Sequence, residues 1–456
     1  GNESSTYRLS LSQNEFEGVI IGSEKSRTIG RLNLTQKAID DRLTLNATIA
    51  ATFEKNDYVN YGSNGPHDVL YQAFQRNPTD PVYEEDGETY YEQARDFNYN
   101  NPVALANDIQ NDRDAKRYMG NLKADFKIFE GLVFGTNLAY IRDDHESFYF
   151  EPRTLRATEF QGYASRSYGN YESKLLETTL SYNTSFSDVH NVNAVAGYSF
   201  QEDVHTGLSA QGREPLSEYI MSYNLGTLND VNVGDVSSYK SSNRLISFFG
   251  RVAYNYDNRY YITGTVRQDG SSKFGANNEW GLFPSGSVKW NLKQESFMQN
   301  IPFIGQFAVR FGFGFTGNQE IGNYNDINSY VVSGSTVNFE TGDDAILFTG
   351  AHNANPDLKW EENREYNAGL DFGFFNNRIS GSFEYYDKIT YDLIANYAVN
   401  VPPNILPNTW ANAGEISNKG YELMLQGFVV TSDVADWKTA VTFSQNDQKV
   451  DRKSVV

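Results

Sequence analysis

The chain has 456 residues, a formal net charge of −20 and no cysteine, which excludes disulfides and cysteine-ligated metal sites. The acidic balance argues against a nucleic-acid partner, because phosphate binding needs a basic surface. Only 39% of the residues are hydrophobic and no run of about 18 apolar residues occurs, so a membrane-spanning helix is excluded.

The first three predicted strands cover residues 6–11, 31–35 and 43–53. Between residues 43 and 53, Leu, Ala, Ile and Phe alternate with Thr and Asn. A period of two places successive side chains on opposite faces of a β-strand. Asp68 lies in the polar stretch that follows, where it is placed to cap a short helix.

Later segments repeat the same alternation as hairpins with short polar turns. They pair residues 121–128 with 132–140, 176–186 with 192–200, 246–256 with the segment reaching 267–270, 366–374 with 379–385, and 421–429 with 437–443, and a further strand covers 282–292. We count about fifteen strands of roughly ten residues, the length that tilted membrane strands need.

The clearest alternation runs through residues 306–316, QFAVRFGFGFT. Four phenylalanines and Val309 share one face, whereas Arg310 lies on the other face among small and polar residues. An apolar outside and a polar inside are typical of a transmembrane β-barrel, and aromatic girdles would account for the 31 Tyr and 30 Phe. The predicted fold is therefore all-β, a transmembrane antiparallel β-barrel.

Long polar stretches separate the hairpins. We predict extracellular loops at about 55–117, 142–173, 201–242, 317–360 and 395–411, because long loops are normal on that side of a large barrel. The whole chain, residues 1–456, is predicted to be one partial outer-membrane barrel.

Two motifs have a functional and a structural interpretation. Residues 312–317, GFGFTG, match the spacing of a dinucleotide-binding turn, but such a turn must open a helix and none is predicted here. Residues 143–146, DDHE, offer metal-ligand types, but neighbouring strand residues point in opposite directions, which favours a solvated loop. No catalytic motif stands out, so we predict no enzyme activity, no cofactor and no metal site.

Charged residues on the polar face are candidates for a solute path. They are Lys123, Asp125, Arg251, Arg267, Lys289, Arg310 and Glu384. Polar walls of this kind serve equally to bind a plug domain inside a barrel, and the sequence leaves both interpretations open. Trp360 and Trp410, with Tyr90 and Tyr91, could stack on sugar rings, although loop aromatics more often pack their own loop.

Several segments resemble the SusC/RagA type of TonB-dependent outer-membrane transporter of Bacteroidetes. They are residues 267–275 (RQDGSSKFG), 280–290 (WGLFPSGSVKW), 311–322 (FGFGFTGNQEIG), 358–362 (LKWEE), 385–394 (YYDKITYDLI) and 412–423 (NAGEISNKGYEL). Their order and spacing make the resemblance specific, and weaker similarity covers nearly the whole chain.

The resemblance implies a multi-pass barrel of about 22 strands in the bacterial outer membrane, closed around an N-terminal plug. It implies TonB as the energy-transmitting partner, a SusD-type surface lipoprotein as a lid, oligosaccharides or peptides as substrates, and dimers of transporter–lipoprotein pairs. Because this chain starts in strand-like sequence, we expect it to lack the plug, the TonB-contacting region and the terminal strands.

Other functions remain open at this point. A siderophore receptor or another outer-membrane barrel, such as a passive porin, would share the strand pattern. A β-rich surface binding module that does not transport would also alternate in this way, but it would stay in buffer without detergent.

Overall fold

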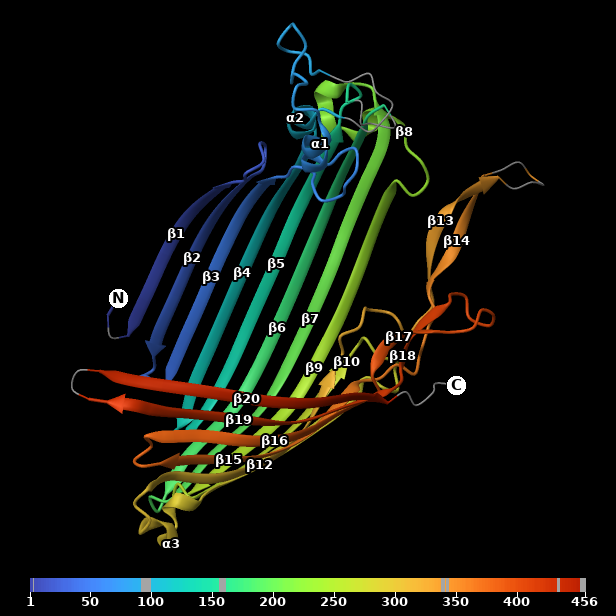
Figure 1. Cartoon of the computed structure of the whole chain (residues 1–456). Helices are drawn as coiled ribbons and strands as arrows, with labels where there is room; N and C mark the ends of the chain where they lie inside the picture. Colours follow the sequence, from blue (N-terminus) through green and yellow to red (C-terminus); the bar gives the residue numbers. More distant parts are fainter. Residues whose placement is uncertain are drawn as a thin grey trace.

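The computed structural model describes residues 1–2, 4–91, 100–155, 161–337, 341, 344–432 and 435–451. Its main element is a 16-stranded antiparallel sheet in which only β8 lies off the main path (Figure 1). Neighbours in this path are mostly neighbours in sequence, as in a meander of hairpins. The all-β prediction is confirmed.

The first half of the sheet contains the longest strands. These are β1 (Ser5–Glu17), β2 (Glu24–Ala38), β3 (Leu43–Asp57), β4 (Gln110–Phe129), β5 (Leu132–Glu151), β6 (Tyr163–Phe186), β7 (His190–Pro215), β8 (Leu228–Asp230) and β9 (Val236–Tyr256).

The second half continues the path and carries two separate hairpins, β13–β14 and β17–β18. Its strands are β10 (Tyr260–Ser271), β11 (Trp280–Asn291), β12 (Ile304–Asn318), β13 (Ser329–Val337), β14 (Asp344–His352), β15 (Glu361–Phe374), β16 (Ile379–Tyr391), β17 (Ile394–Ala398), β18 (Asn408–Asn412), β19 (Glu415–Thr431) and β20 (Asp436–Asp451).

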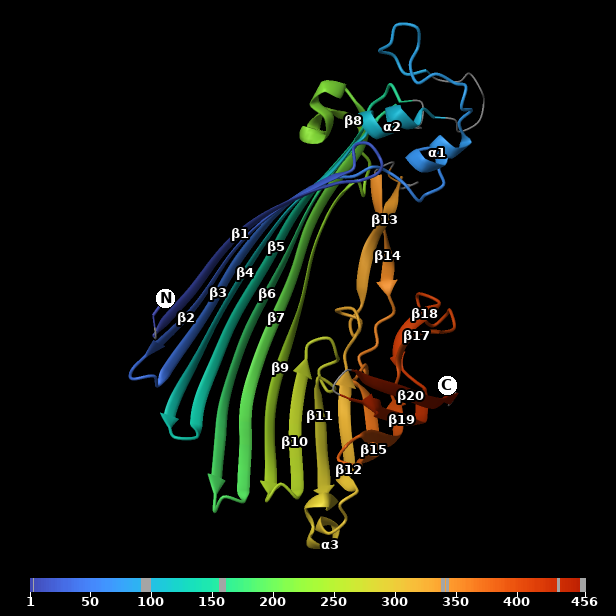
Figure 2. The same ribbon diagram turned by 60° about the vertical axis from the view of Figure 1, so that its left-hand side comes forward.

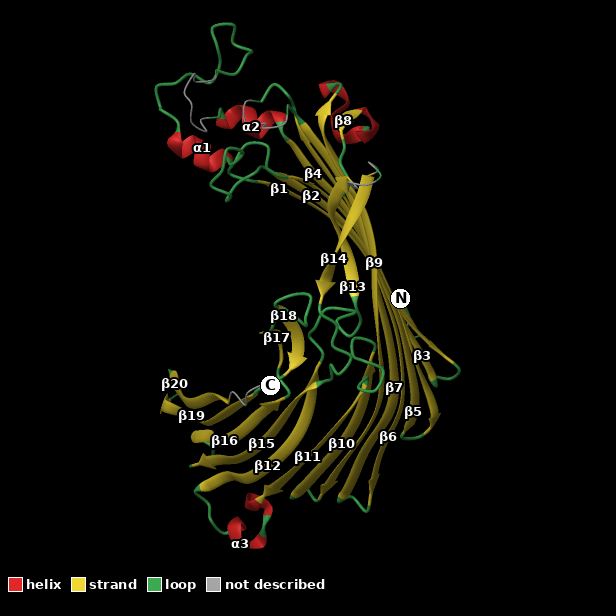
Figure 3. Ribbon diagram, turned by 90° about the vertical axis from the view of Figure 1, so that its right-hand side faces the viewer, coloured by secondary structure: helices red, strands yellow, loops and turns green. Residues whose placement is uncertain are grey.

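The sheet is curved, and its two faces differ in chemistry. We call the face that carries Arg310 the inner face, and the face that carries Phe311 the outer face. The β17–β18 hairpin lies on the concave side (Figure 3), and the amide of Ile394 donates to the inner-face carboxylate of Glu361 at 3.0 Å. The concave face of the sheet is therefore the polar one.

The outer face carries a continuous band of exposed apolar side chains. Phe311 is 46% exposed, and its register partners Val288 and Ala368 continue the row onto both neighbouring strands. In β3, Ile49 is 59% exposed, whereas the inner-face Ala50 is 7% exposed. So much exposed apolar surface suits a hydrocarbon solvent and would be a liability in water.

Aromatic and charged residues mark the ends of this band. Phe53 and Tyr118 meet edge to face, with ring centroids 6.1 Å apart, at the end nearer the long loops. Beside these rings, Arg142 lies opposite Tyr118 on β5 and pairs with Asp144 at 2.8 Å and with Glu172 at 3.3 Å. The outer face thus changes from apolar to charged through an aromatic row, as membrane interfaces require.

The strands extend further than the sequence pattern indicates. β5 has 20 residues, about twice the roughly 9–11 that a tilted strand needs to cross a bilayer. Strands β5 and β6 take in most of residues 142–173, and β7 and β9 take in much of 201–242. These predicted loop boundaries are corrected: beyond the apolar band both faces are polar, so alternation disappears while backbone pairing continues.

The remaining predicted loops also contain regular structure. Residues 110–117 belong to β4, residues 317–360 include the β13–β14 hairpin, and residues 395–411 overlap β17 and β18. Figures 1 and 2 show the β13–β14 hairpin continuing beyond the end of β12 as a sheet of its own. Placement of these segments on the extracellular side remains a prediction.

Two short helices fill the segment between β3 and β4. They are α1 (Val69–Gln75) and α2 (Pro102–Asp108), and they enclose a small apolar core that includes Val69 and Leu105. The predicted cap is confirmed, because the carboxylate of Asp68 accepts a hydrogen bond from the amide of Tyr71 at 3.0 Å. Among the described residues, no helix is long and apolar enough to cross a membrane.

The opposite ends of the strands are joined by short turns. In the β9–β10 turn, Asp257 and Asn258 have φ angles of 49° and 55°. Asp and Asn tolerate this left-handed conformation better than other non-glycine residues, and two such residues suit the twist of a tight hairpin. The turn residues therefore fix the register on which the two faces depend.

We predict that an arginine introduced on the outer face destabilises the sheet, whereas one introduced on the inner face of the same strand is tolerated. Val266 lies on the outer face and is 53% exposed, whereas Thr263 lies on the inner face of the same strand. Val266→Arg should lower the unfolding free energy in lipid vesicles by about 2–4 kcal/mol. Thr263→Arg serves as the control and should cost much less; equal losses would contradict the assignment of faces.

The polar inner wall as the candidate functional site

The strongest polar cluster of the inner wall surrounds Arg310. Its guanidinium contacts the carboxylates of Asp371, at 3.0 Å, and Glu384, and Lys289 approaches Asp371 at 3.7 Å. Four neighbouring strands, β11, β12, β15 and β16, supply these residues. The register places Glu384 directly opposite Glu422, so Arg310 offsets a like-charge pair that would otherwise destabilise the sheet.

A hollow of about 740 Å³ lies over this part of the wall. Its polar lining includes Thr263, Ser285, Ser287, Asn363, Glu365 and Asn367, together with Lys289 and Arg310. Hydroxyl, amide and charged groups can each donate or accept hydrogen bonds with a hydrated solute. The lining can therefore bind such a solute through these groups.

Arg267 forms a second cluster on β10. It donates to Asp269 at 2.8 Å and to the hydroxyl of Ser247 at 2.9 Å, and its guanidinium carbon lies 5.7 Å from the ring centroid of Phe249. These contacts fix the side chain against the wall.

The other wall candidates lie apart from Arg310. Lys123 and Asp125 pair with each other at 3.1 Å on β4, and several strands of the sheet path separate them from β12. Arg251 on β9 has no ion-pair partner in the described part of the chain. The structure therefore brings together Lys289, Arg310 and Glu384 and leaves the other candidates distributed along the wall.

Trp360 lies in an apolar cluster within the loops. It is 6% exposed, packs against the rings of Phe274 and Phe283, and donates its indole N–H to the carbonyl of Glu279 at 2.8 Å. Trp410 packs against the same cluster. Loop packing accounts for Trp360, since neither ring face is open to a sugar, and stacking by Trp410 stays a prediction.

Tyr90 also packs within its loop. Its ring stacks on Tyr83 with centroids 5.3 Å apart, and its hydroxyl accepts a hydrogen bond from Asn107 at 3.1 Å. Tyr91 lies beside the guanidinium of Arg76.

Asparagine side chains brace the loops in a way that the sequence analysis missed. The amide of Asn353 donates to the carbonyls of Leu406 and Asn408 at 2.7 and 2.8 Å. Asn355 donates to the carbonyl of Trp410 at 2.9 Å. The abundance of Asn in these loops was visible, but its partners lie more than 50 residues away, so no local pattern shows them.

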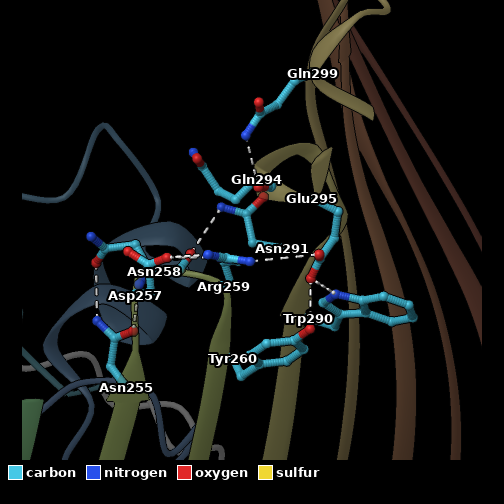
Figure 4. Close-up of polar contacts among 10 residues, drawn as sticks. All are labelled: Asn255, Asp257, Asn258, Arg259, Tyr260, Trp290, Asn291, Gln294, Glu295 and Gln299. Carbon is cyan, nitrogen blue, oxygen red and sulfur yellow. Dashed lines mark hydrogen bonds and ion pairs between the residues drawn. The ribbon is translucent and has the colours of Figure 1, made fainter. Parts of the chain in front are cut away.

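A second missed cluster lies at the short-turn end of the sheet (Figure 4). Glu295 accepts hydrogen bonds from the hydroxyl of Tyr260 at 2.7 Å and from the indole of Trp290 at 3.0 Å, and Arg259 lies 3.8 Å away. Glu295 precedes the short helix α3 (Ser296–Gln299), which leads into β12. The carboxylate thus ties two interface aromatic residues to the connection between β11 and β12.

The two motifs singled out in the sequence have structural roles. Residues 312–317 lie within β12 and open no helix. In β5, Asp144 and Glu146 lie on the outer face and pair with Arg142 and with Arg166 of β6. Asp143 lies on the inner face and pairs with Arg117, so the motif divides between the two faces. Among the described residues, no group of three side chains could hold a metal ion.

Comparison with known proteins decides the family. A model of the family "TonB dependent receptor-like, beta-barrel" matches residues 39–455. The chain belongs to the TonB-dependent receptor β-barrel family. The resemblance seen in the sequence is confirmed, and membership places this TonB-dependent receptor in the bacterial outer membrane.

Curated relatives cover almost all of this receptor chain. TonB-dependent receptor P3 of Formosa agariphila is 32% identical over 465 residues, which is 99% of this chain and 45% of that protein. TonB-dependent receptor SusC of Bacteroides thetaiotaomicron is 26% identical over 472 residues, 97% of this chain and 45% of that protein. The chain spans about half the length of the curated relatives it matches.

Solved structures share the fold. The RagAB peptide transporter has a TM-score of 0.80 at 22% identity, covering 99% of this chain and 50% of that chain. The ferric citrate transporter FecA has a TM-score of 0.54 at 10% identity, covering 100% of this chain and 56% of that chain.

Removing the central arginine should weaken the wall. Arg310→Gln leaves Asp371 and Glu384 without the guanidinium, and we expect the unfolding free energy of the receptor to fall by about 1 kcal/mol, since the side chains are partly screened by water. Urea titration in vesicles measures this change. Arg251→Gln removes the same charge without an ion pair and should have a smaller effect; an equal or larger one would contradict the network.

The Glu295 cluster predicts a pH dependence. Hydrogen bonds from Tyr260 and Trp290 hold the pKa of Glu295 below its ordinary value. The stabilisation is therefore present above the ordinary carboxyl pKa and is lost as the pH falls through the lowered one. Hydrogen exchange of residues 292–299 should be faster in Glu295→Ala than in the wild type at pH 7, and this difference should shrink in acid. Gln294→Ala should show neither effect.

Proposed function

We propose that this chain forms part of the wall of a TonB-dependent importer that takes oligosaccharides or peptides across the bacterial outer membrane. The observation that carries the proposal is a curved sheet with an apolar exposed outside and a charged, hydroxyl-rich inside. Lipid contacts the first surface and a hydrated solute the second, which is the arrangement that passage across a membrane requires.

Import in this proposal involves binding and displacement, without covalent chemistry. The inner wall offers hydrogen-bonding and charged groups to the solute or to a plug, and TonB supplies the energy through a region outside this chain. Strands outside this chain would pair with the edges β1 and β20 and complete a barrel of about 22 strands. The plug is thus a proposed part of the whole protein, and TonB is a proposed separate partner.

A SusD-type surface lipoprotein is the proposed partner at the long-loop end. Support comes from the similarity to SusC and from the fold shared with RagAB, which is described as a peptide transporter. The long polar ends of β4 to β9, with α1 and α2 above them, would provide the docking platform (Figure 1). Two such pairs would associate as a dimer.

A siderophore receptor is the rival function. The fold similarity to FecA, with a TM-score of 0.54, is lower than the 0.80 for RagAB, and it favours the SusC-type proposal. A soluble binding module is disfavoured by the exposed apolar band, since water would have to cover Leu9, Ile49 and Phe311.

Purification of the full-length protein from native membranes tests the proposal. We expect a lipoprotein of the SusD type to co-purify in equal amount, and mass spectrometry of the released ligand should find oligosaccharides or peptides. Loss of uptake of that ligand in a strain without TonB would complete the evidence. A ferric siderophore as the ligand, or a protein that remains in buffer without detergent, would contradict the proposal.

A further inference from the structure

Strands β1 to β4 separate charge by face. On the inner face, β2 presents Lys25, Arg27, Arg31 and Lys37. On the same face, β4 presents Arg113, Arg117, Lys123 and Lys127, and β1 adds Arg8. Glu54 and Asp125 are the acidic residues of this face within the four strands.

The outer face of the same strands has the opposite balance. Its acidic residues are Glu15, Glu17, Glu24, Asp57, Asp112 and Asp114, against the basic Lys55 and Lys116. A shift of register by one residue would exchange these faces, so the segregation is a consequence of the strand pairing. A basic inner face is unexpected in a chain with a net charge of −20.

Contacts within the wall confirm which way the basic side chains point. Lys25 and Arg27 both reach Glu54, at 2.9 and 2.8 Å, from the next strand. Arg117 reaches Asp143 on β5 at 3.4 Å. These pairs hold the basic side chains over the concave face.

Other basic residues of this face have no such partner. In the described ranges, Arg8, Arg31 and Arg113 form no ion pair. Arg8 and Arg31 are exposed and Arg113 is half-buried. Arg8 and Arg31 lie in adjacent register positions of the same face, where like charges repel one another and are stabilised by a bound anion.

The basic side chains surround a hollow of about 600 Å³. Arg27, Arg113 and Arg117 line it together with Thr52, His145 and Tyr171. The carboxylates of Glu54, Asp143 and Asp144 also line it, and each is already paired with an arginine. In the register, Arg117 lies opposite Thr52 and Arg113 opposite Asn56, level with and just beyond the end of the apolar row at Phe53 and Tyr118. The hollow therefore lies near the long-loop end of the wall, at the edge of the membrane band, where an entering solute arrives first.

We propose that the inner face of β1 to β4 is a binding site for anionic groups, carboxylates or sulfates, of the imported solute. Guanidinium groups form paired hydrogen bonds with both kinds of anion, and Thr52 and Tyr171 can bind neighbouring hydroxyls. The inference rests on the proposed importer function and specifies its substrate class as acidic oligomers.

The test uses the full-length transporter with its co-purified lipoprotein in detergent. The probes are an oligogalacturonate hexamer, which carries carboxylates, a sulfated galactan hexamer, and neutral maltohexaose. The variant Arg31→Gln/Arg113→Gln removes two basic groups that have no ion pair. The control Lys55→Gln/Lys240→Gln removes the same charge from exposed positions on the outer face.

We expect calorimetry to show binding of one or both acidic hexamers at least about tenfold tighter than binding of maltohexaose. The inner-face variant should lose about tenfold in affinity for the acidic probe, the control should lose none, and added salt should weaken wild-type binding. If the double variant does not fold, Arg113→Gln alone should show a smaller loss in the same direction.

The inference is overturned if acidic and neutral hexamers bind alike, if neither acidic hexamer binds, or if the control loses as much affinity as the variant. Loss of plug anchoring without loss of anion binding in the variant would also overturn it, since the basic face would then serve the plug. TonB-dependent uptake of the native ligand, measured in parallel, separates the two proposals: uptake that persists without acid selectivity contradicts this inference alone.

Discussion

The two-residue repeat of the β-strand is the constraint on which this structure depends. Because successive side chains point to opposite faces, each strand presents one row to lipid and one row to the aqueous interior. Hairpin turns such as Asp257–Asn258 fix the register, and a slip of one residue would place Arg310 in hydrocarbon and Phe311 in the lumen. Fold, membrane placement and the chemistry of the wall all follow from this register.

Local patterns were sufficient to predict the faces of the strands but not their ends. Within the apolar band, alternation identifies β12 and its neighbours residue by residue. Beyond the band both faces are polar, so β5 and β6 continue through a segment that composition alone describes as a loop. Cross-strand ion pairs, such as that between Arg142 and Glu172, stabilise these extensions, and a single strand's sequence does not show its partner.

For the candidate site, the sequence likewise predicted the kind of residue but not which residues come together. The polar type of each wall residue was evident, whereas the cluster of Arg310 with Asp371 and Glu384 joins residues 61 and 74 positions apart. Trp360 was assigned a possible contact with sugar, but distant partners enclose it in a loop core. Charge segregation on β1 to β4 became visible only when the register gave each charge a face.

Spin-label accessibility along β12 tests the central claim most directly. The chain contains no cysteine, so single cysteines can be introduced into residues 308–313 of the receptor and labelled in lipid vesicles. The account predicts that labels at Val309, Phe311 and Phe313 collide with dissolved oxygen, and that labels at Ala308, Arg310 and Gly312 collide with a water-soluble nickel chelate. Equal accessibility at all six positions, or the reverse alternation, would contradict it.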